Sequence, residues 1–134
     1  MTTREWAARY LARGWAIIPI SARSKVPPAG FYLAAHLRGE KRLNEVDVAE
    51  WWKDGSTHGI AVLTGMVSGI VVADVDPRNG GELLADPRTL CAARTGGGGW
   101  HYFYEHPYNT TRTGKCSRPG VDRKASGGYV VVEP

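Results

Sequence analysis

Two aspartates at the end of an apolar stretch are the strongest candidates for chemistry in this sequence. Asp74 and Asp76 close the stretch 69–76, whose β-branched residues predict a buried strand. Because strand side chains alternate in direction, both carboxylates point to one face, with Cα atoms about 6.5–7 Å apart. Such carboxylates repel each other, and a divalent cation with oxygen ligands, Mg²⁺ or Mn²⁺, relieves the repulsion. The alternative is that both residues form turns ahead of 77–81.

Four consecutive glycines, 96–99, form a second candidate site. Without Cβ atoms, their backbone amides can approach a phosphate closely. The turn is not a P-loop, because no Gly-Lys-Ser/Thr follows and the next residues predict a strand. His101 lies two residues beyond the glycines, where it can donate a hydrogen bond to a phosphate oxygen. The alternatives are a plain hairpin loop and a structural histidine.

A third acid, Asp122, lies on a short predicted strand with Lys124 on the same face. The two residues form either a surface ion pair of little energetic value or part of a charged site. Further cationic residues of the C-terminal half suit either a solvated face or the binding of a triphosphate or nucleic-acid backbone. They are Arg94, Arg112, Lys115, Arg118 and Arg123. The order of the signals, Asp-x-Asp, then a glycine turn with His, then a third Asp, makes the combination informative.

The elements that position these residues mix helices and strands. A capping box at Thr2 and Glu5 predicts a helix to about Arg13, with Trp6, Tyr10 and Leu11 on its buried stripe. Asn44 caps a second clear helix, and a short helix and one helical turn are also expected. These helices cover 45–53, 31–38 and 81–85, the last broken by Asp86-Pro87.

Seven strands are predicted, at 15–20, 59–64, 69–76, 90–95, 100–105, 121–124 and 129–132, with a polar loop at 107–119. A tight turn between 59–64 and the aspartate strand suggests an antiparallel hairpin. Short connections of this kind predict an α+β fold with a mostly antiparallel sheet.

Length and composition fit one ordinary globular domain. The chain has 134 residues, 43% of them hydrophobic and 22% charged, with a net charge of +4. This moderate basic excess is compatible with a polyanionic partner. No apolar run approaches the ~18 residues that a membrane span requires. The two cysteines, Cys91 and Cys116, are expected to be reduced thiols in a cytoplasmic compartment.

The combined pattern resembles the N-terminal bifunctional primase–polymerase (prim-pol) domain of the archaeo-eukaryotic primase superfamily. The similarity extends over nearly the whole chain and rests on three motifs in the family's order. These are residues 68–76, 95–103, and 120–122 with 127–131, supported by 15–20, Lys25, Pro27, 51–52 and 60–65.

The resemblance implies an RRM-like catalytic sheet with flanking helices and template-directed nucleotidyl transfer. Asp74, Asp76 and Asp122 would bind two metal ions, Mg²⁺ or Mn²⁺, and His101 would contact the phosphates of the nucleotide. Thr95, Gly97, Gly98, Gly99 and Lys124 would lie at the nucleotide. The implied partners are single-stranded DNA template, nucleoside triphosphates and a C-terminal helicase domain, in the replication of a plasmid, phage or mobile element.

The sequence departs from the family pattern at 124–126, where Lys-Ala-Ser replaces a basic residue, a glycine and a polar or acidic residue. Relatives usually continue beyond the position of Pro134, so we expect this chain to be the N-terminal part of a larger replication protein. Two alternatives stay open. A metal-dependent nuclease would degrade single-stranded DNA without incorporating nucleotides, and a non-catalytic module would bind nucleotide or nucleic acid without turnover.

Overall fold

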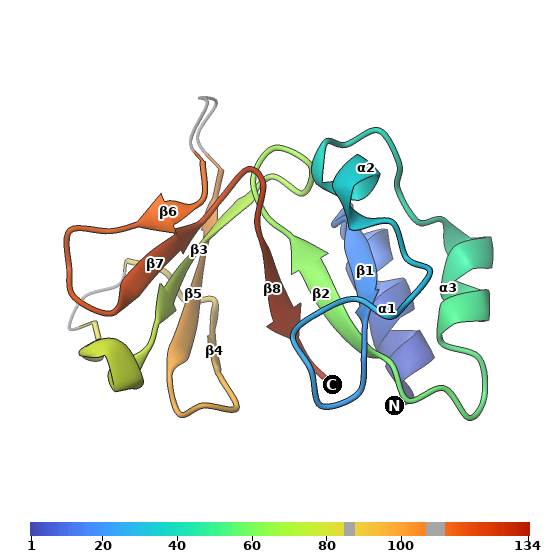
Figure 1. The fold of residues 1–134 in the computed structure, drawn as a ribbon, viewed down its shortest axis with the longest axis horizontal. Coiled ribbons are helices and arrows are strands. Elements are labelled where there is room, and N and C mark those ends of the chain that lie inside the picture. Colours follow the sequence, from blue (N-terminus) through green and yellow to red (C-terminus); the bar gives the residue numbers. More distant parts are fainter. Residues whose placement is uncertain (85–87, 107–111) are drawn as a thin grey trace. The chain divides into compact units, whose positions relative to one another are not determined.

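The computed structural model of the protein describes residues 1–84, 88–106 and 112–134 (Figure 1). The chain divides into two compact units, residues 1–63 with 129–134, and residues 64–128. Each unit contains one sheet, and the named strand pairs in both sheets are antiparallel. The α+β class with antiparallel sheets is therefore confirmed. No helix among the described residues has the length and apolar character needed to cross a membrane.

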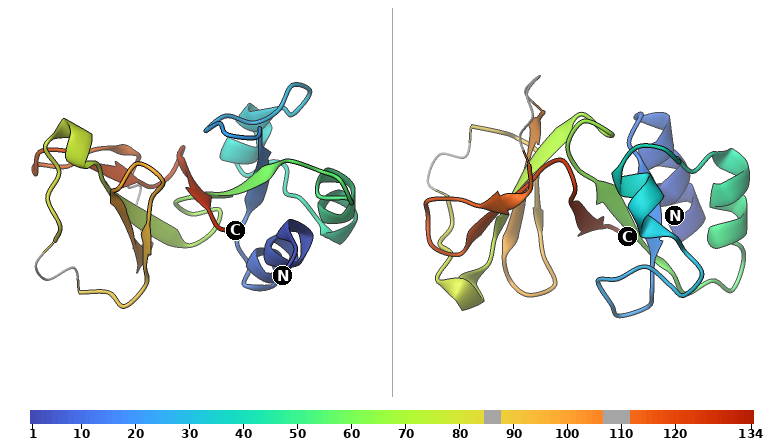
Figure 2. Two further views of the ribbon diagram at one scale, coloured as in Figure 1. Left: turned by 90° about the horizontal axis from the view of Figure 1, so that it is seen from below. Right: turned by 45° about the horizontal axis from the view of Figure 1, so that its top comes forward.

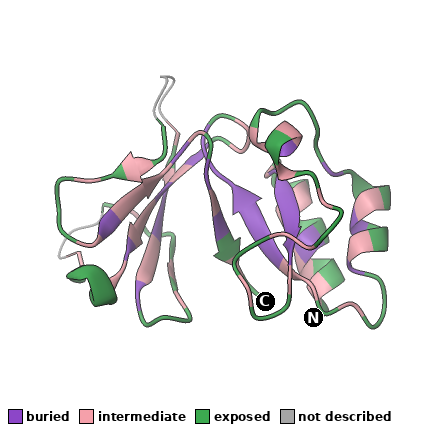
Figure 3. Ribbon diagram, in the orientation of Figure 1, coloured by how far each residue is buried: buried purple, intermediate pink, exposed green. Residues whose placement is uncertain are grey.

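The first unit is built on a three-stranded sheet in the order β1-β2-β8. Its strands are β1 (Ile17–Ile20), β2 (Gly59–Leu63) and β8 (Tyr129–Val132). Every residue of β1 and nearly all of β2 are buried, so this sheet forms the core of the unit (Figure 3). Such continuous apolar runs, without polar alternation, are typical of strands covered on both faces.

Three helices flank this sheet: α1 (Thr3–Ala12), α2 (Leu33–Leu37) and α3 (Glu45–Trp51). Helix α1 contacts β1, β2 and α3, and α2 lies on the other side of the sheet (Figure 2). Both predicted helix starts are confirmed, since Thr2 and Asn44 each accept a hydrogen bond from the third helical amide and form capping boxes.

The second unit is a five-stranded sheet in the order β4-β5-β3-β7-β6, with β3 at its centre. Its strands are β3 (Ile70–Val75), β4 (Ala92–Arg94), β5 (Trp100–Glu105), β6 (Gly114–Lys115) and β7 (Val121–Lys124). One face carries the buried cluster of Val75, Tyr102 and Val121. A short 3-10 helix, η1 (Pro77–Asn79), follows β3 directly.

Two sequence-based predictions about these elements were wrong. The strands at 59–64 and 69–76 do not form a hairpin, because β2 pairs with β1 and β8 while β3 pairs with β5 and β7. Residues 81–84 are not helical; Ala85 and the proposed break at Asp86-Pro87 lie outside the described residues. The predicted stripe of α1 is confirmed in part, because Trp6, Tyr10 and Leu11 are partly buried, whereas its fully buried member, Ala7, was not predicted.

The predicted loop at 107–119 contains one short strand, β6. Residues 107–111 of that loop lie outside the described part of the chain. A two-residue strand has too little alternation to be recognised in a sequence, so the presence of β6 could not be predicted.

The buried His36 of α2 makes folding stability depend on pH. Its ring packs at a tilt against Phe31 with ring centroids 4.6 Å apart, and its Nδ1 has no hydrogen-bond partner. Burial lowers the pKa of His36, and the positive charge of Lys41 lowers it further, with a smaller opposing effect from Asp47. The unfolded chain therefore takes up this proton first as the pH falls.

We expect the free energy of unfolding to be highest above pH ~6.5 and to fall below it, by at most about 1.4 kcal/mol per pH unit for this one proton. Urea denaturation at pH 7.5 and pH 5.5 measures the effect, and His36→Gln should reduce it. Glu5 and Glu40 titrate below this range, since hydrogen bonds from Thr2 and Arg38 lower their pKa values. An unchanged pH dependence in the His36→Gln variant would contradict the assignment.

Candidate functional site

The central strand β3 brings three of the predicted site residues into one row. Asp74 is directly opposite His101 of β5 on one side and Asp122 of β7 on the other. Directly opposite residues of antiparallel strands have side chains on the same face, with Cβ atoms about 4.5–5.5 Å apart. The structure thus places an imidazole, a carboxylate and a second carboxylate side by side across three strands. The other face of the same strands carries the apolar cluster.

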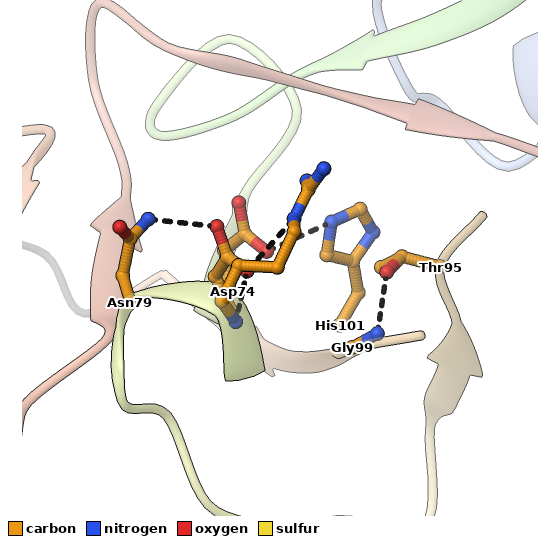
Figure 4. Close-up of polar contacts among 7 residues, drawn as sticks. Asp74, Asn79, Thr95, Gly99 and His101 are labelled. Atoms are coloured by element: carbon orange, nitrogen blue, oxygen red, sulfur yellow. Dashed lines mark hydrogen bonds and ion pairs between the residues drawn. The ribbon is translucent and has the colours of Figure 1, made fainter. Parts of the chain in front are cut away.

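The side chains of Asp74 and His101 point toward each other (Figure 4). His101 Nε2 lies 3.3 Å from Asp74 Oδ1, and the two side chains are 12% and 28% exposed. The contact fixes the orientation of the imidazole ring. The ring also packs edge-on against Phe103, two residues along the same strand face. His101 is therefore held on two sides while part of the neighbouring carboxylate stays accessible to solvent.

Asp76 has an extended backbone, and its amide donates to the carbonyl of Gly120 at 2.7 Å, which continues the β3–β7 pairing. Its side chain is the N-cap of η1. Oδ1 accepts from the amide of Arg78 at 2.9 Å, and Oδ2 accepts from Asn79 Nδ2 at 2.8 Å. Asp76 therefore has the turn-forming role that was the alternative to metal binding in the sequence analysis. Each oxygen keeps lone-pair capacity for another ligand.

The fit of a metal ion to this site rests on the type and position of its donors. Carboxylate oxygens are the ligands that Mg²⁺ and Mn²⁺ prefer, and Asp74 and Asp122 are cross-strand neighbours. Within residues 1–84, 88–106 and 112–134, no group of three His, Cys, Asp or Glu side chains is close enough to hold a metal. The chemistry of the donors fits a divalent cation, whereas a closed three-ligand cluster is not present in this conformation.

The glycine turn joins β4 to β5 and is closed by Thr95. The amide of Thr95 donates to the Gly99 carbonyl at 2.9 Å, and the amide of Gly98 donates to the Thr95 carbonyl at 3.0 Å. Thr95 Oγ1 accepts from the amide of Gly99 at 2.9 Å (Figure 4). Since Gly98 and Gly99 donate within the turn, a phosphate would meet the amides of Gly96 and Gly97 or compete for the others.

The lysines on this face come from two strands. Lys124 lies two residues from Asp122 on the same face of β7, as predicted from alternation. Lys115 of β6 is directly opposite Asp122, so it extends the row that begins at His101. The position of Lys115 opposite Asp122 could not be predicted, because Lys115 was one of several basic residues in a predicted loop.

Two glycines of the same turn should respond differently to alanine. A Cβ on Gly99 would lie 2.1 Å from the carbonyl oxygen of Val75, whereas a Cβ on Gly96 would meet nothing within 4 Å. We expect Gly99→Ala to lower the free energy of unfolding by about 1–3 kcal/mol and Gly96→Ala to change it by less than about 0.5 kcal/mol. Chemical denaturation measures both variants. Equal losses of stability would show that the hairpin does not pack against β3 in this way.

Comparison with models of protein families identifies a family that matches this chain. The family described as bifunctional DNA primase/polymerase, N-terminal (Prim-Pol) matches residues 7–134. No curated protein matches the sequence. The family match includes every element of the row across β5, β3 and β7, and the glycine turn beside it. The chain belongs to the bifunctional DNA primase/polymerase N-terminal family.

Proposed function

We propose that this protein joins nucleoside triphosphates into a strand complementary to a single-stranded DNA template, with release of pyrophosphate. The observation that carries the proposal is the row formed by His101, Asp74 and Asp122 across three adjacent strands. The family match supports nucleotidyl transfer as the type of reaction. The row supplies acids and a hydrogen-bond donor on one accessible face.

In this proposal Asp74 and Asp122 hold divalent cations, Mg²⁺ or Mn²⁺, with Asp76 as the third acid. The bound cations would make a 3′-hydroxyl more acidic and neutralise charge on the leaving pyrophosphate. Phosphoryl transfer depends mainly on positioning and charge neutralisation, so the protein needs to supply few other reactive groups. The two opposed carboxylates are suited to this task because their backbones are fixed by the same sheet.

His101 and the lysines would bind the nucleotide. The imidazole lies two residues beyond the glycine turn and is already oriented by Asp74 and Phe103, so little conformational freedom is lost when it donates to a phosphate oxygen. Lys115 and Lys124 flank Asp122 and add positive charge beside the acids. A triphosphate or template backbone next to this row would be attracted to that charge.

A pure binding module is a weaker explanation of this face. Nucleic-acid binders with an RRM-type sheet use exposed aromatic side chains for base stacking. On β5 Tyr102 belongs to the apolar cluster on the face opposite to His101, and Trp100 packs against that cluster. Phe103 shares the face of His101 but is only 8% exposed and packs against the imidazole, so it is not available for base stacking. The setting that we propose, replication of a plasmid, phage or mobile element together with a helicase, follows from the family resemblance alone.

Asp74→Asn and Asp122→Asn test the role of the two opposed acids. Each change keeps the side-chain shape and removes the negative charge, so we expect nucleotide incorporation to fall by at least about 100-fold. Extension of a primed and an unprimed DNA template with Mg²⁺ or Mn²⁺ is the measurement. Asp54→Asn is the matched control, because that side chain is fully exposed and lies 3.8 Å from Arg4 in the other unit.

Two outcomes would contradict the proposal. Full activity in both variants would remove the acids from the mechanism. Degradation of single-stranded DNA by the wild-type protein, with loss in the same variants and no nucleotide incorporation, would instead assign the site to a nuclease.

A further inference from the structure

A guanidinium lies between Asp76 and the glycine turn. Arg78 Nε is 3.4 Å from Asp76 Oδ1, and a Cβ added to Gly97 would lie 3.0 Å from Arg78 Nη2. The Arg78 side chain is nevertheless 66% exposed. Arg78 thus lies beside both Asp76, at the end of β3, and the glycine turn, which follows about twenty residues later in the sequence.

The local backbone explains how Arg78 reaches this position. Pro77 begins η1 and fixes the direction of the chain immediately after Asp76. Both the amide and the side chain of Arg78 then approach the same carboxylate oxygen of Asp76. Glycine at position 97 leaves room for the guanidinium beside the turn.

The contact between Arg78 and Asp76 is weak enough for the guanidinium to exchange the carboxylate for a phosphate group. An exposed ion pair at this distance contributes little to stability and separates at low cost. The ion-pair contact with Asp76 is made by Nε, and the guanidinium carries five donors in a planar fork that matches phosphate oxygens. A cation bound by Asp76 would weaken the attraction of the carboxylate for the guanidinium still further.

A second arginine at the same turn is placed differently. Arg94 ends β4, directly before Thr95, and its guanidinium lies 5.6 Å from the ring centroid of Trp100. Arg94 is opposite Trp100 in the β4–β5 pairing, so it shares the face opposite to His101. The turn therefore has one arginine beside the acids and another on the far face, which provides a matched comparison.

We propose that Arg78 binds the phosphate groups of the incoming nucleoside triphosphate beside the glycine turn and that Asp76 holds the guanidinium there before the nucleotide arrives. This inference rests on the proposed function, because it takes the nucleoside triphosphate as the substrate. Arg78 joins the site as a phosphate-binding residue, in addition to the acids and His101.

Calorimetric titration with tripolyphosphate and with a nucleoside triphosphate, both in the presence of Mg²⁺, tests the proposal. We expect Arg78→Ala to weaken both affinities by about tenfold or more, since it removes charge-assisted hydrogen bonds. Arg78→Lys should give an intermediate loss, because an ammonium keeps the charge without the planar fork. Arg94→Ala should leave both affinities unchanged.

Several results would overturn the inference. These are unchanged affinity in Arg78→Ala, an equal loss in Arg94→Ala, or no tripolyphosphate binding by the wild-type protein. A lower melting temperature of Arg78→Ala with wild-type affinity would assign Arg78 to bracing the turn and would also overturn it.

Nucleotide incorporation separates this inference from the proposed function. If the wild-type protein incorporates nucleotides and Arg78→Ala has the same KM, Arg78 does not bind the phosphates, whereas the proposed function is supported. Tripolyphosphate binding that depends on Arg78, in a protein that incorporates nothing, would support phosphate binding by Arg78 and contradict the proposed function.

Discussion

The pairing of β3 with both β5 and β7 is the constraint on which the site depends. Its register places Asp74 between His101 and Asp122. A slip of one residue in either pair would turn the opposing side chain to the other face. The packing of Val75, Tyr102 and Val121 on that face opposes such a slip, because it would expose apolar surface and bury charge. The apolar cluster therefore fixes the geometry of the acidic row on the face that it does not occupy.

Close backbone contacts at the end of β3 connect this row to the loops beside it. The amide of Gly81 donates to the Asp76 carbonyl at 2.8 Å, and a Cβ on Gly120 would lie 2.1 Å from the Gly81 nitrogen. On the β5 side, Gly99 lies directly against the Val75 carbonyl. These glycines allow three chain segments to approach within backbone distance. As a result, the cap of η1, the glycine turn and the start of β7 lie around the end of β3, where Asp74 and Asp76 are located.

Much of the fold could be predicted from local pattern. The capping box at Thr2 and the N-cap residue Asn44 marked the starts of α1 and α3, and the spans of β5 and β8 were predicted to the residue. Strand pairing could not be predicted, because β2 joins β8 near the other end of the chain and no local signal encodes that choice. Alternation predicted that Asp74 and Asp76 share a face. It could not show that Asp76 caps η1 or that Arg78 returns to the glycine turn, since both depend on side-chain geometry after the strand ends.

The central claim is that the opposed carboxylates of Asp74 and Asp122 form the core of a cation site. The most direct measurement is an anomalous difference map from crystals of the protein soaked with Mn²⁺ and a nucleoside triphosphate. The account predicts a manganese peak in contact with carboxylate oxygens of both residues, with the triphosphate on the same sheet face as His101. Manganese bound elsewhere in the molecule, with both carboxylates uncoordinated beside an ordered nucleotide, would contradict it.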